Sequence, residues 1–415
     1  MHIAIVGAGI VGVATAYELA CDGHAVTVFE QRSAAAEEAS FANAGALAPS
    51  LLIPWAAPGI GGPLRRQLFG AQATLRFAGG VRRSEWAWLW RWRQAGRRPA
   101  AAATLAALAR LGSYSLDRTR RVAADLELDP ETSRGTLVVL RTAQDVALVQ
   151  PALQVLRDAG VQVAEVDADT ARLIEPGLSP DTPLAGALHI ADGESANCRL
   201  FAQMLRYAAQ ERGAQFVFQS RVESLRTAPA GVRLAGEADA RRFDAVIVCA
   251  GLAAPALLRP LGLPLPVTAL HGYSISAPLR EDSHAPQGTV IDPLHRLTIT
   301  RQGQRVRVSG GAEIGQGDGS HHAPTLQTLY HALSGWFPGG AQLSSTQVQV
   351  WRGARPMLPD GAPVVGASGL PGLWINAGHG AAGWAQACGS ARAVADLVAG
   401  RPPEIDLQAL GMRRF

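Results

Sequence analysis

The feature that most constrains this chain is its first thirty residues, MHIAIVGAGIVGVATAYELACDGHAVTVFE. The apolar run from His2 to Val6 predicts a buried parallel strand, and it leads directly into three glycines with G-x-G-x-x-G spacing. Apolar residues then recur at helical spacing as far as Asp22, and a second apolar run, from Ala25 to Phe29, ends at an acidic residue. Strand, glycine turn, helix and second strand together predict a Rossmann-like unit.

Each part of this unit has a role in binding a dinucleotide. Gly7 permits the tight turn, Gly9 lets the backbone approach a pyrophosphate, and Gly12 lets helix and strand pack closely. The phosphates are expected at the helix N-terminus, where unpaired N–H groups and the positive end of the helix dipole face them. Glu30 is placed to accept hydrogen bonds from a ribose diol, which disfavours NADP and leaves FAD and NAD.

The composition excludes several classes of protein. At 415 residues the chain is long for one domain, so two closely joined domains are expected. The net charge of +4 is spread along the chain and does not favour a nucleic-acid partner. The sequence contains no lysine, which excludes a lysine Schiff base and therefore pyridoxal phosphate chemistry. Its four cysteines lie far apart, so neither a metal site nor a disulfide framework is predicted, and a reducing compartment fits.

The distribution of apolar residues also bears on location. No stretch reaches the roughly 18 uninterrupted apolar residues that a membrane span requires. The N-terminal apolar run is interrupted by Glu18 and Asp22, so it does not resemble a signal peptide. We therefore expect a cytoplasmic protein, or one attached peripherally to the inner face of the cytoplasmic membrane.

Residues 82–98, RRSEWAWLWRWRQAGRR, alternate tryptophans with arginines. Indole rings sit at headgroup depth and arginines bind anionic lipid, so this segment suits peripheral contact with a membrane. In the alternative interpretation, the pairs Trp86/Trp90 and Trp88/Trp92, each four residues apart, cover the core of a second domain. Both interpretations remain open, because the expected helix lacks a single apolar face.

Three later segments also have the composition of ligand-binding turns. SFANAG at 40–45 combines small residues, which let the backbone lie close to a flat ligand, with hydrogen-bonding side chains, although a plain surface loop has the same composition. An apolar strand at 243–249 leads into Ala250-Gly251, a second turn of close approach. A strand at 374–377 leads into GHGAAGW at 378–384 and then a helix, whose N-terminus could stabilise negative charge.

The sequence resembles the FAD-dependent D-amino-acid oxidase superfamily, and most closely its bacterial D-amino-acid dehydrogenases. The resemblance covers essentially the whole chain, and its matching segments are SFANAG (40–45), PWAAPG (54–59), the tryptophan-rich segment, DGESANCRLF (192–201), GYSI (272–275), ARPMLPDGAPVVG (354–366) and GHGAAGW (378–384). It implies a mixed α/β fold, the GR2-type flavoprotein, in which a Rossmann-like FAD-binding domain is interleaved with a substrate domain of β-sheet plus helices. The FAD-binding domain would comprise residues 1–55, 189–264 and 352–415, and the substrate domain residues 56–188 and 265–351.

The resemblance also implies roles for individual residues. Val222 would contact the adenine through its backbone, and residues 380–383 would face the pyrimidine end of the flavin. The residues that would bind FAD are Gly7, Gly9, Gly12, Glu30, Ser40, Asn43, Gly45, Val222, Gly251, Gly378, His379, Gly380, Ala381, Ala382 and Gly383. The candidate catalytic residues are Arg355, Tyr273 and His271.

Four of these side chains have competing interpretations. Arg355 matches the arginine that binds the substrate carboxylate, for which a planar guanidinium is well suited, although an arbitrary arginine is more often part of a surface salt bridge. Tyr273 could direct its hydroxyl at the substrate or be a half-buried strand residue. His379 could be a flavin neighbour or a loop histidine. His271 is a candidate for the substrate pocket on the same terms, and it stands where the closest relatives carry lysine, so a pKa near neutrality replaces a fixed charge.

The expected activity is the oxidative deamination of D-amino acids to 2-oxo acids. Hydride would pass from the substrate Cα to FAD, and the electrons would pass on to a quinone or a dye. One alternative is a related flavoenzyme acting on a secondary amine such as D-proline, hydroxy-D-proline or sarcosine. The other is a non-catalytic flavin-binding protein.

Overall fold

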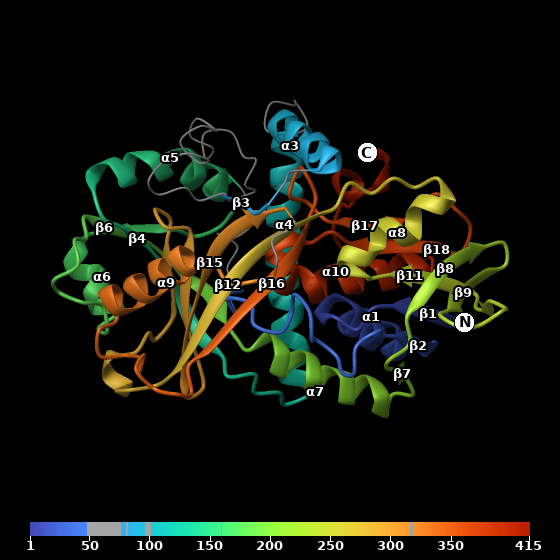
Figure 1. Ribbon diagram of the computed structural model, residues 1–415, viewed down its shortest axis with the longest axis horizontal. Coiled ribbons are helices and arrows are strands. Elements are labelled where there is room, and N and C mark those ends of the chain that lie inside the picture. Colours follow the sequence, from blue (N-terminus) through green and yellow to red (C-terminus); the bar gives the residue numbers. More distant parts are fainter. Residues whose placement is uncertain (48–75, 80–81, 96–100, 159, 316–318) are drawn as a thin grey trace.

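The structure, a computed structural model, describes residues 1–47, 76–79, 82–95, 101–158, 160–315 and 319–415. The segment PWAAPG at 54–59 and the end of the tryptophan-rich segment lie outside these ranges. Two β-sheets form two lobes side by side, with helices α4 (Ala101–Asp125) and α10 (Gly383–Val398) near the junction between them (Figure 1). The mixed α/β fold predicted from the sequence is confirmed.

The first lobe is built on a six-stranded sheet with the two N-terminal strands near its centre. Its strands, in spatial order, are β17 (Val364–Ala367), β18 (Leu373–Ala377), β11 (Ala245–Val248), β1 (His2–Val6), β2 (Ala25–Phe29) and β7 (Gln215–Val217). All neighbouring strands pair in parallel except β17, which runs antiparallel to β18. Parallel strands in the centre of a sheet are covered on both faces, which explains why β1 and β2 are almost continuously apolar.

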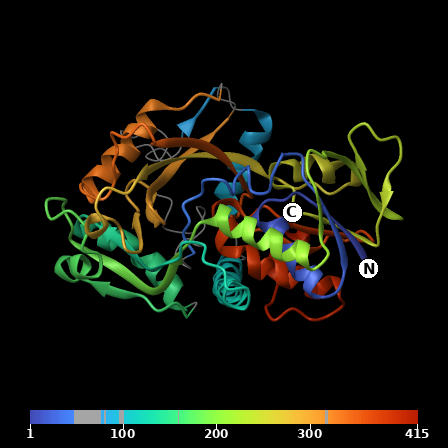
Figure 2. The ribbon, with the colours of Figure 1, turned by 90° about the horizontal axis from the view of Figure 1, so that it is seen from below.

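Both faces of this sheet are buried. Alternate side chains such as Ile3 and Ile5 contact a helical layer formed by α1 (Ile10–Cys21), α4, α7 (Cys198–Glu211) and α10. In Figure 2 α7 crosses this layer close to α10, where the rings of Phe201 and Trp384 lie 4.9 Å apart. The intervening side chains contact a layer made by β8 (Val222–Thr227), β9 (Ala230–Leu234), β10 (Arg241–Arg242) and α8 (Ala254–Leu258).

The second lobe is built on a nine-stranded sheet. Its strands follow the order β16 (Gln349–Met357), β12 (Thr268–Pro278), β15 (Arg305–Ile314), β14 (Leu297–Gln302), β13 (Thr289–Asp292), β4 (Ser133–Leu140), β6 (Gly186–Ser195) and β5 (Ala164–Val166), with β3 (Arg76–Phe77) paired to β15. Helices α6 (Ala168–Ile174) and α9 (Ala323–Trp336) pack on one face, which carries Ile275 and Val308. Helix α5 (Ala143–Asp158) packs Leu153 on the opposite face.

The chain crosses repeatedly between the two lobes. Strands β6 and β16 belong to the nine-stranded sheet and span two of the predicted segment boundaries, 188/189 and 351/352. The boundary at 55/56 lies outside the described residues. The division of the chain into domains therefore stays a prediction. In the structure the chain leaves the nine-stranded sheet for the first lobe after Ser195, at the end of β6, and after Met357, at the end of β16. The short 3₁₀ helices are η2 (Gly251–Ala253), η3 (Arg259–Leu261), η4 (Asp282–His284), η5 (Gly380–Ala382), η6 (Gln408–Leu410) and η7 (Met412–Arg414).

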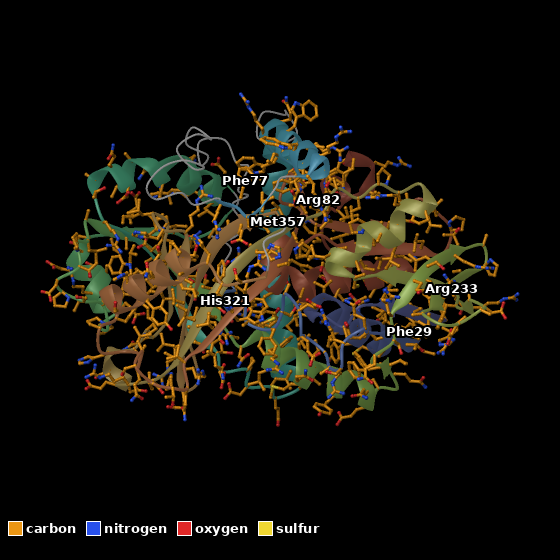
Figure 3. The ribbon with its side chains drawn as sticks, in the orientation of Figure 1. Phe29, Phe77, Arg82, Arg233, His321 and Met357 are labelled. Atoms are coloured by element: carbon orange, nitrogen blue, oxygen red, sulfur yellow. The ribbon has the colours of Figure 1, made fainter. Side chains whose placement is uncertain are left out.

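Helix α3 (Arg83–Ala95) separates its four tryptophans into two pairs. Trp88 is buried and donates its indole N–H to the carbonyl oxygen of Met357 at 3.1 Å, and Trp92 stacks on it. Met357 and Phe77, which belong to the same apolar cluster, lie beneath this helix in Figure 3. Trp86 and Trp90 are 60% and 61% exposed. The core interpretation therefore applies to one pair, and the second pair faces solvent. Within the described ranges, no helix is both long and apolar enough to cross a bilayer.

We expect the two pairs of tryptophans to differ in their contribution to stability. Replacing Trp88 with serine removes a buried ring and leaves a cavity, which should lower the free energy of unfolding by about 3–5 kcal/mol. Replacing the exposed Trp90 with serine should change it by no more than about 0.5 kcal/mol. Urea unfolding of both variants beside the wild type measures the difference. Equal effects would show that α3 does not pack as described.

Candidate functional site

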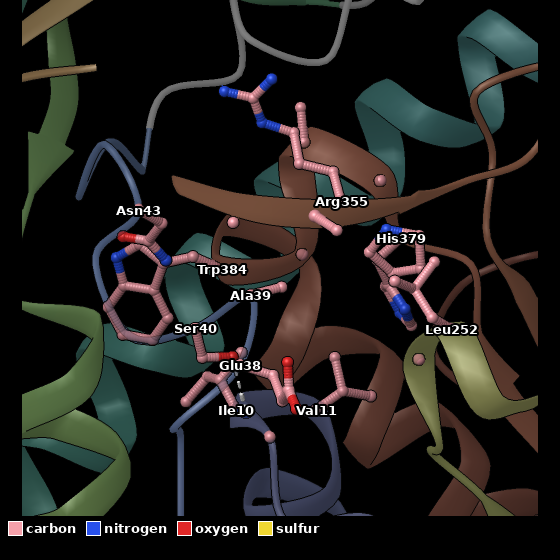
Figure 4. A pocket seen from close by; sticks show the side chains of 18 of the residues that line it. Ile10, Val11, Glu38, Ala39, Ser40, Asn43, Leu252, Arg355, His379 and Trp384 are labelled. Carbon is pink, nitrogen blue, oxygen red and sulfur yellow. Dashed lines mark hydrogen bonds between the residues drawn. The ribbon is translucent and has the colours of Figure 1, made fainter. Parts of the chain in front are cut away.

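A cavity of about 1260 Å³ connects the two sheets. Figure 4 shows Arg355 at one end, the side chains of Ser40, Asn43 and Trp384 along one side, and those of His379 and Leu252 along the other. The predicted residues that line the cavity are Gly7, Gly9, Glu30, Ser40, Asn43, Gly45, Val222, Gly251, Tyr273, Arg355, Gly378, His379, Gly380, Ala381 and Gly383. The remaining three, Gly12, His271 and Ala382, are not among the residues that line it.

The glycines of the N-terminal turn differ in their surroundings. Gly7 has a φ of +103°, and a Cβ there would lie 2.7 Å from the carbonyl oxygen of Cys249. A Cβ on Gly12 would overlap the carbonyl oxygen of Gly7, so this glycine permits the close packing of α1 against β1. A Cβ on Gly9 would meet only the Ser40 hydroxyl, at 3.6 Å. Gly9 therefore leaves the backbone open to the cavity at the start of α1.

The carboxylate of Glu30 follows β2 and is buried. It accepts backbone N–H groups from Ala8 at 2.7 Å and from Arg32 at 2.8 Å. An ionised carboxylate has about four acceptor positions, so acceptor capacity remains for a diol in the cavity. Val222 lies nearby, because the backbone of Ser220 donates to the carbonyl oxygen of Glu30. Figure 3 shows Phe29 and Arg233, which line this end of the cavity.

Ser40 and Asn43 make hydrogen bonds within the protein. The Ser40 hydroxyl accepts the backbone N–H of Ile10 at 3.1 Å, which satisfies one donor in the first turn of α1. The side-chain oxygen of Asn43 accepts the N–H of Gly45 at 2.9 Å and closes an Asx turn. Both side chains therefore shape the backbone of the 40–45 loop, a role that the sequence analysis did not assign to them.

Residues 43–45 are held by side chains from both lobes. From the nine-stranded sheet, Thr300 donates to one carbonyl oxygen of the loop at 2.8 Å and Arg307 to another at 3.1 Å. From α10, Trp384 donates its indole N–H to a third at 3.1 Å. The sequence analysis missed Thr300 and Arg307, since neither stands in a motif. Trp384 was visible only as the end of GHGAAGW.

The turn before α10, residues 378–383, borders the cavity. Gly378 and Gly380 have φ values of +82° and +56°, which few residues other than glycine adopt. Helix α10 begins at Gly383 without a side-chain cap. Its first N–H groups and the positive end of its dipole therefore form a position that favours negative charge.

His379 borders the cavity but is buried within the protein. Its Nε2 lies 3.1 Å from the hydroxyl of Ser390, and burial lowers the pKa of the imidazole to about 3. The ring is therefore neutral over the whole physiological range. A charged imidazole at this position would oppose the dipole of α10.

Arg355 lines the cavity as a half-buried cation. Its Nη1 donates to the carbonyl oxygen of Gly311 at 3.0 Å, and no carboxylate of the described chain pairs with it. Burial lowers the pKa of the guanidinium to about 10, so it stays protonated at neutral pH. A half-buried cation that lines a cavity and pairs with no described carboxylate is suited to binding an anionic ligand.

Gly272 allows the guanidinium of Arg355 to lie against strand β12. A Cβ on Gly272 would lie 2.6 Å from the central carbon of the guanidinium and 2.7 Å from Nη1. No larger residue fits without displacing the side chain of Arg355. Gly272 is therefore a positioning residue that the sequence analysis did not identify, although it belongs to the GYSI match.

Tyr273 and His271 lie on the face of the sheet opposite Arg355. Leu270 pairs with Arg355 across the two strands, and side chains alternate between faces along β12, so residues 271 and 273 point the other way. Tyr273 is among the residues that line the cavity, but its hydroxyl donates to Glu313 at 3.0 Å. Burial and the neighbouring Arg352 lower the pKa of His271. The structure therefore does not bring either polar group together with Arg355.

We expect His379 to make the protein sensitive to acid. Its pKa is 6.5 when exposed and about 3 when folded, so the unfolded chain binds a proton in this window and the folded protein does not. The free energy of unfolding should fall as the pH drops from 6.5 towards 3, by up to about 1.4 kcal/mol per pH unit from this residue. Urea unfolding of His379→Asn at several pH values should show a shallower slope. The exposed His331→Asn is the control, and equal slopes in all three proteins would contradict the assignment.

Comparison with known proteins agrees with this geometry. The chain is 39% identical over 421 residues to a D-amino acid dehydrogenase of Cereibacter sphaeroides, covering 100% of this chain and 95% of the relative. It is 36% identical over 420 residues to a D-amino acid dehydrogenase of Agrobacterium fabrum, with 100% of both chains covered.

A solved structure shares the fold at low identity. The glycine oxidase of Geobacillus kaustophilus superposes with a TM-score of 0.78 at 22% identity, covering 100% of this chain and 98% of that protein. Residues 2–397 match the family described as FAD dependent oxidoreductase. On this match and on the full-length relatives, the chain belongs to the family of FAD dependent oxidoreductases.

Proposed function

We propose that this protein oxidises D-amino acids to 2-oxo acids, with FAD as the cofactor that its family requires. The observation that carries the proposal is Arg355, a half-buried guanidinium without a carboxylate partner in the described chain, in a cavity bordered by the glycine turns after β1 and β18. The full-length relatives named D-amino acid dehydrogenase support the same substrate class.

The residues along the cavity fit FAD. Gly9 is open where a pyrophosphate must approach, Glu30 retains acceptor capacity for a ribose diol, and the uncapped start of α10 suits the pyrimidine end of the flavin. These positions lie along one cavity that continues to Arg355. Bound FAD supplies the hydride acceptor, and the remaining chemistry is binding and orientation.

The side chains of the cavity orient the substrate. Arg355 binds the substrate carboxylate through its planar fork, and the carbonyl oxygen of Gly311 fixes the rotation of that fork. Fixing the carboxylate selects which face of the substrate Cα points into the FAD-binding part of the cavity. Hydride can leave a neutral amine directly, so no general base is required. The neutral imidazole of His379 adds no charge beside α10.

We expect Arg355 to dominate substrate binding. Arg355→Ala leaves a carboxylate unpaired in a closed site and should reduce kcat/KM for D-alanine by about 3–5 kcal/mol in transition-state free energy. Arg355→Lys should recover only part of the loss, because one ammonium cannot bind both oxygens. Flavin absorbance should be unchanged in both variants. Turnover by Arg355→Ala within a few-fold of the wild type would contradict the assignment.

A second pair of variants tests the positioning of Arg355 without removing it. Gly272→Ala should displace the guanidinium and lower kcat/KM by roughly a hundredfold. Gly335→Ala, where a Cβ meets nothing within 4 Å, is the matched control and should retain wild-type turnover.

Testing D-alanine beside D-proline and sarcosine, with anaerobic bleaching of the flavin as the signal, separates primary from secondary amines. No bleaching with any of them would leave a non-catalytic flavin protein.

We further propose that the electrons pass to a quinone at a membrane surface. Helix α3 lies at the edge of the molecule (Figure 1), and its exposed Trp86 and Trp90 stand among Arg82, Arg83, Arg91 and Arg93, which are also exposed. Exposed indoles beside arginines suit the headgroup region of an anionic bilayer. No lysine ammonium is available in the chain to promote reduction of oxygen beside the flavin.

Binding to vesicles of anionic lipid tests this proposal. Replacing both Trp86 and Trp90 with serine should abolish sedimentation with vesicles, and added salt should weaken the wild-type interaction, because the surface field is screened within about 10 Å at 0.1 M. Leu173→Ser, which removes an apolar side chain that is 81% exposed on another helix, is the control.

Reoxidation of the substrate-reduced enzyme should be fast with a ubiquinone analogue. Rapid reoxidation by air with stoichiometric peroxide, and no response to quinone, would make it an oxidase.

A further inference from the structure

Trp351 lies beside the side chain of Arg355 on the cavity face of the nine-stranded sheet. The indole of Trp351 covers Gly353, since a Cβ on that glycine would overlap the ring. Gly353 pairs directly with Gly272 across the two strands, and Gly272 is the residue against which the guanidinium lies. Residues paired in this way share a face and lie about 5 Å apart. The indole, which covers Gly353, and the guanidinium, which lies against Gly272, are therefore neighbours on this face of the sheet.

The indole is fixed in this position from a second side. Its ring stacks on Phe41, with the ring centroids 6.2 Å apart and the planes inclined at 27°. Phe41 belongs to the 40–45 loop, and the guanidinium of Arg199 lies 4.1 Å from the centroid of its ring. Trp351 is thus a rigid apolar wall of the cavity between the FAD-binding loop and the carboxylate-binding arginine.

By strand pairing, Ser309, Thr298 and Ile291 share this face of the sheet with Trp351. All three line the cavity, and so does Arg296 in the turn before β14. The acidic residues among the described lining all belong to the opposite, dinucleotide-binding end, and they are Glu30, Glu38 and Glu223. This end of the cavity therefore offers contact surface to an apolar side chain and no described carboxylate to a cationic one.

We propose that Trp351 is the specificity-determining residue of the site, and that the preferred substrates are D-amino acids with large apolar side chains. The proposal rests on the proposed function, since it assumes that Arg355 binds the substrate carboxylate. With the carboxylate on the guanidinium, the side chain packs against the neighbouring indole. Each further methylene group buried there raises kcat/KM severalfold, so D-leucine and D-phenylalanine are preferred to D-alanine and D-lysine.

The experiment compares kcat/KM of the FAD-loaded enzyme for D-alanine, D-leucine, D-phenylalanine and D-lysine with a dye as electron acceptor. Trp351→Ala should lower the ratio of D-leucine to D-alanine roughly ten- to hundredfold, and Trp351→Phe should lower it less. D-alanine itself should stay within a few-fold of the wild type, because it barely reaches the indole. Trp374→Phe, in β18 and away from the cavity lining, is the matched control and should keep the wild-type ratio.

Flavin absorbance of each variant separates a change in specificity from a displaced 40–45 loop, since loss of FAD lowers the rates with all substrates together. An unchanged ratio of D-leucine to D-alanine in Trp351→Ala would overturn the proposal. A ratio that rises would also overturn it, because the indole would then be a steric limit. If the wild-type enzyme prefers D-lysine, the proposed preference for D-amino acids with large apolar side chains is wrong. Failure of the wild-type holoenzyme to oxidise any D-amino acid would refute the proposed function instead.

Discussion

The hydrogen bonds to residues 40–45 are the interactions on which the geometry of the site depends. One end of this loop is bonded to α1 through Ser40, and the other accepts donors from Thr300, Arg307 and Trp384. These donors come from both lobes, and leaving one of the buried groups unpaired costs about 1–3 kcal/mol. Any shift of one sheet against the other would break several of them together. The loop therefore keeps Arg355 of one sheet in register with the turns of the other.

Arginine is suited to position 355 because it keeps its proton there. Burial lowers its pKa to about 10, which still leaves the side chain charged at neutral pH. The same environment would deprotonate a lysine over part of the working range, because its unperturbed pKa is about 10.4. His379 shows the opposite outcome, since burial leaves its imidazole neutral. The cavity thus combines a permanent cation where an anion is expected with a neutral ring beside the helix N-terminus.

Sequence reasoning succeeded where local spacing determines structure. Gly7 and Gly12 make the tight turn and the close packing that their spacing predicts, and the strands expected at 2–6 and 25–29 are β1 and β2. It could not assign Tyr273 to a face, because that depends on the pairing of β12 with β16, some eighty residues later in the chain. It could not separate the tryptophans of α3 either, since only contact with Met357 distinguishes the buried pair. Family resemblance located Arg355, but the need for glycine at position 272 follows from packing alone.

The order of strands in the six-stranded sheet has a consequence for synthesis of the chain. Strand β1 can pair with β2 as soon as both leave the ribosome, but its other edge stays open until β11 emerges more than two hundred residues later. Part of the apolar surface of α1 is covered only when α10 follows near the far end of the chain. Because translation proceeds at about 5–20 residues per second, these surfaces are exposed for many seconds. The nascent protein is therefore a natural client for chaperones that bind apolar segments during translation.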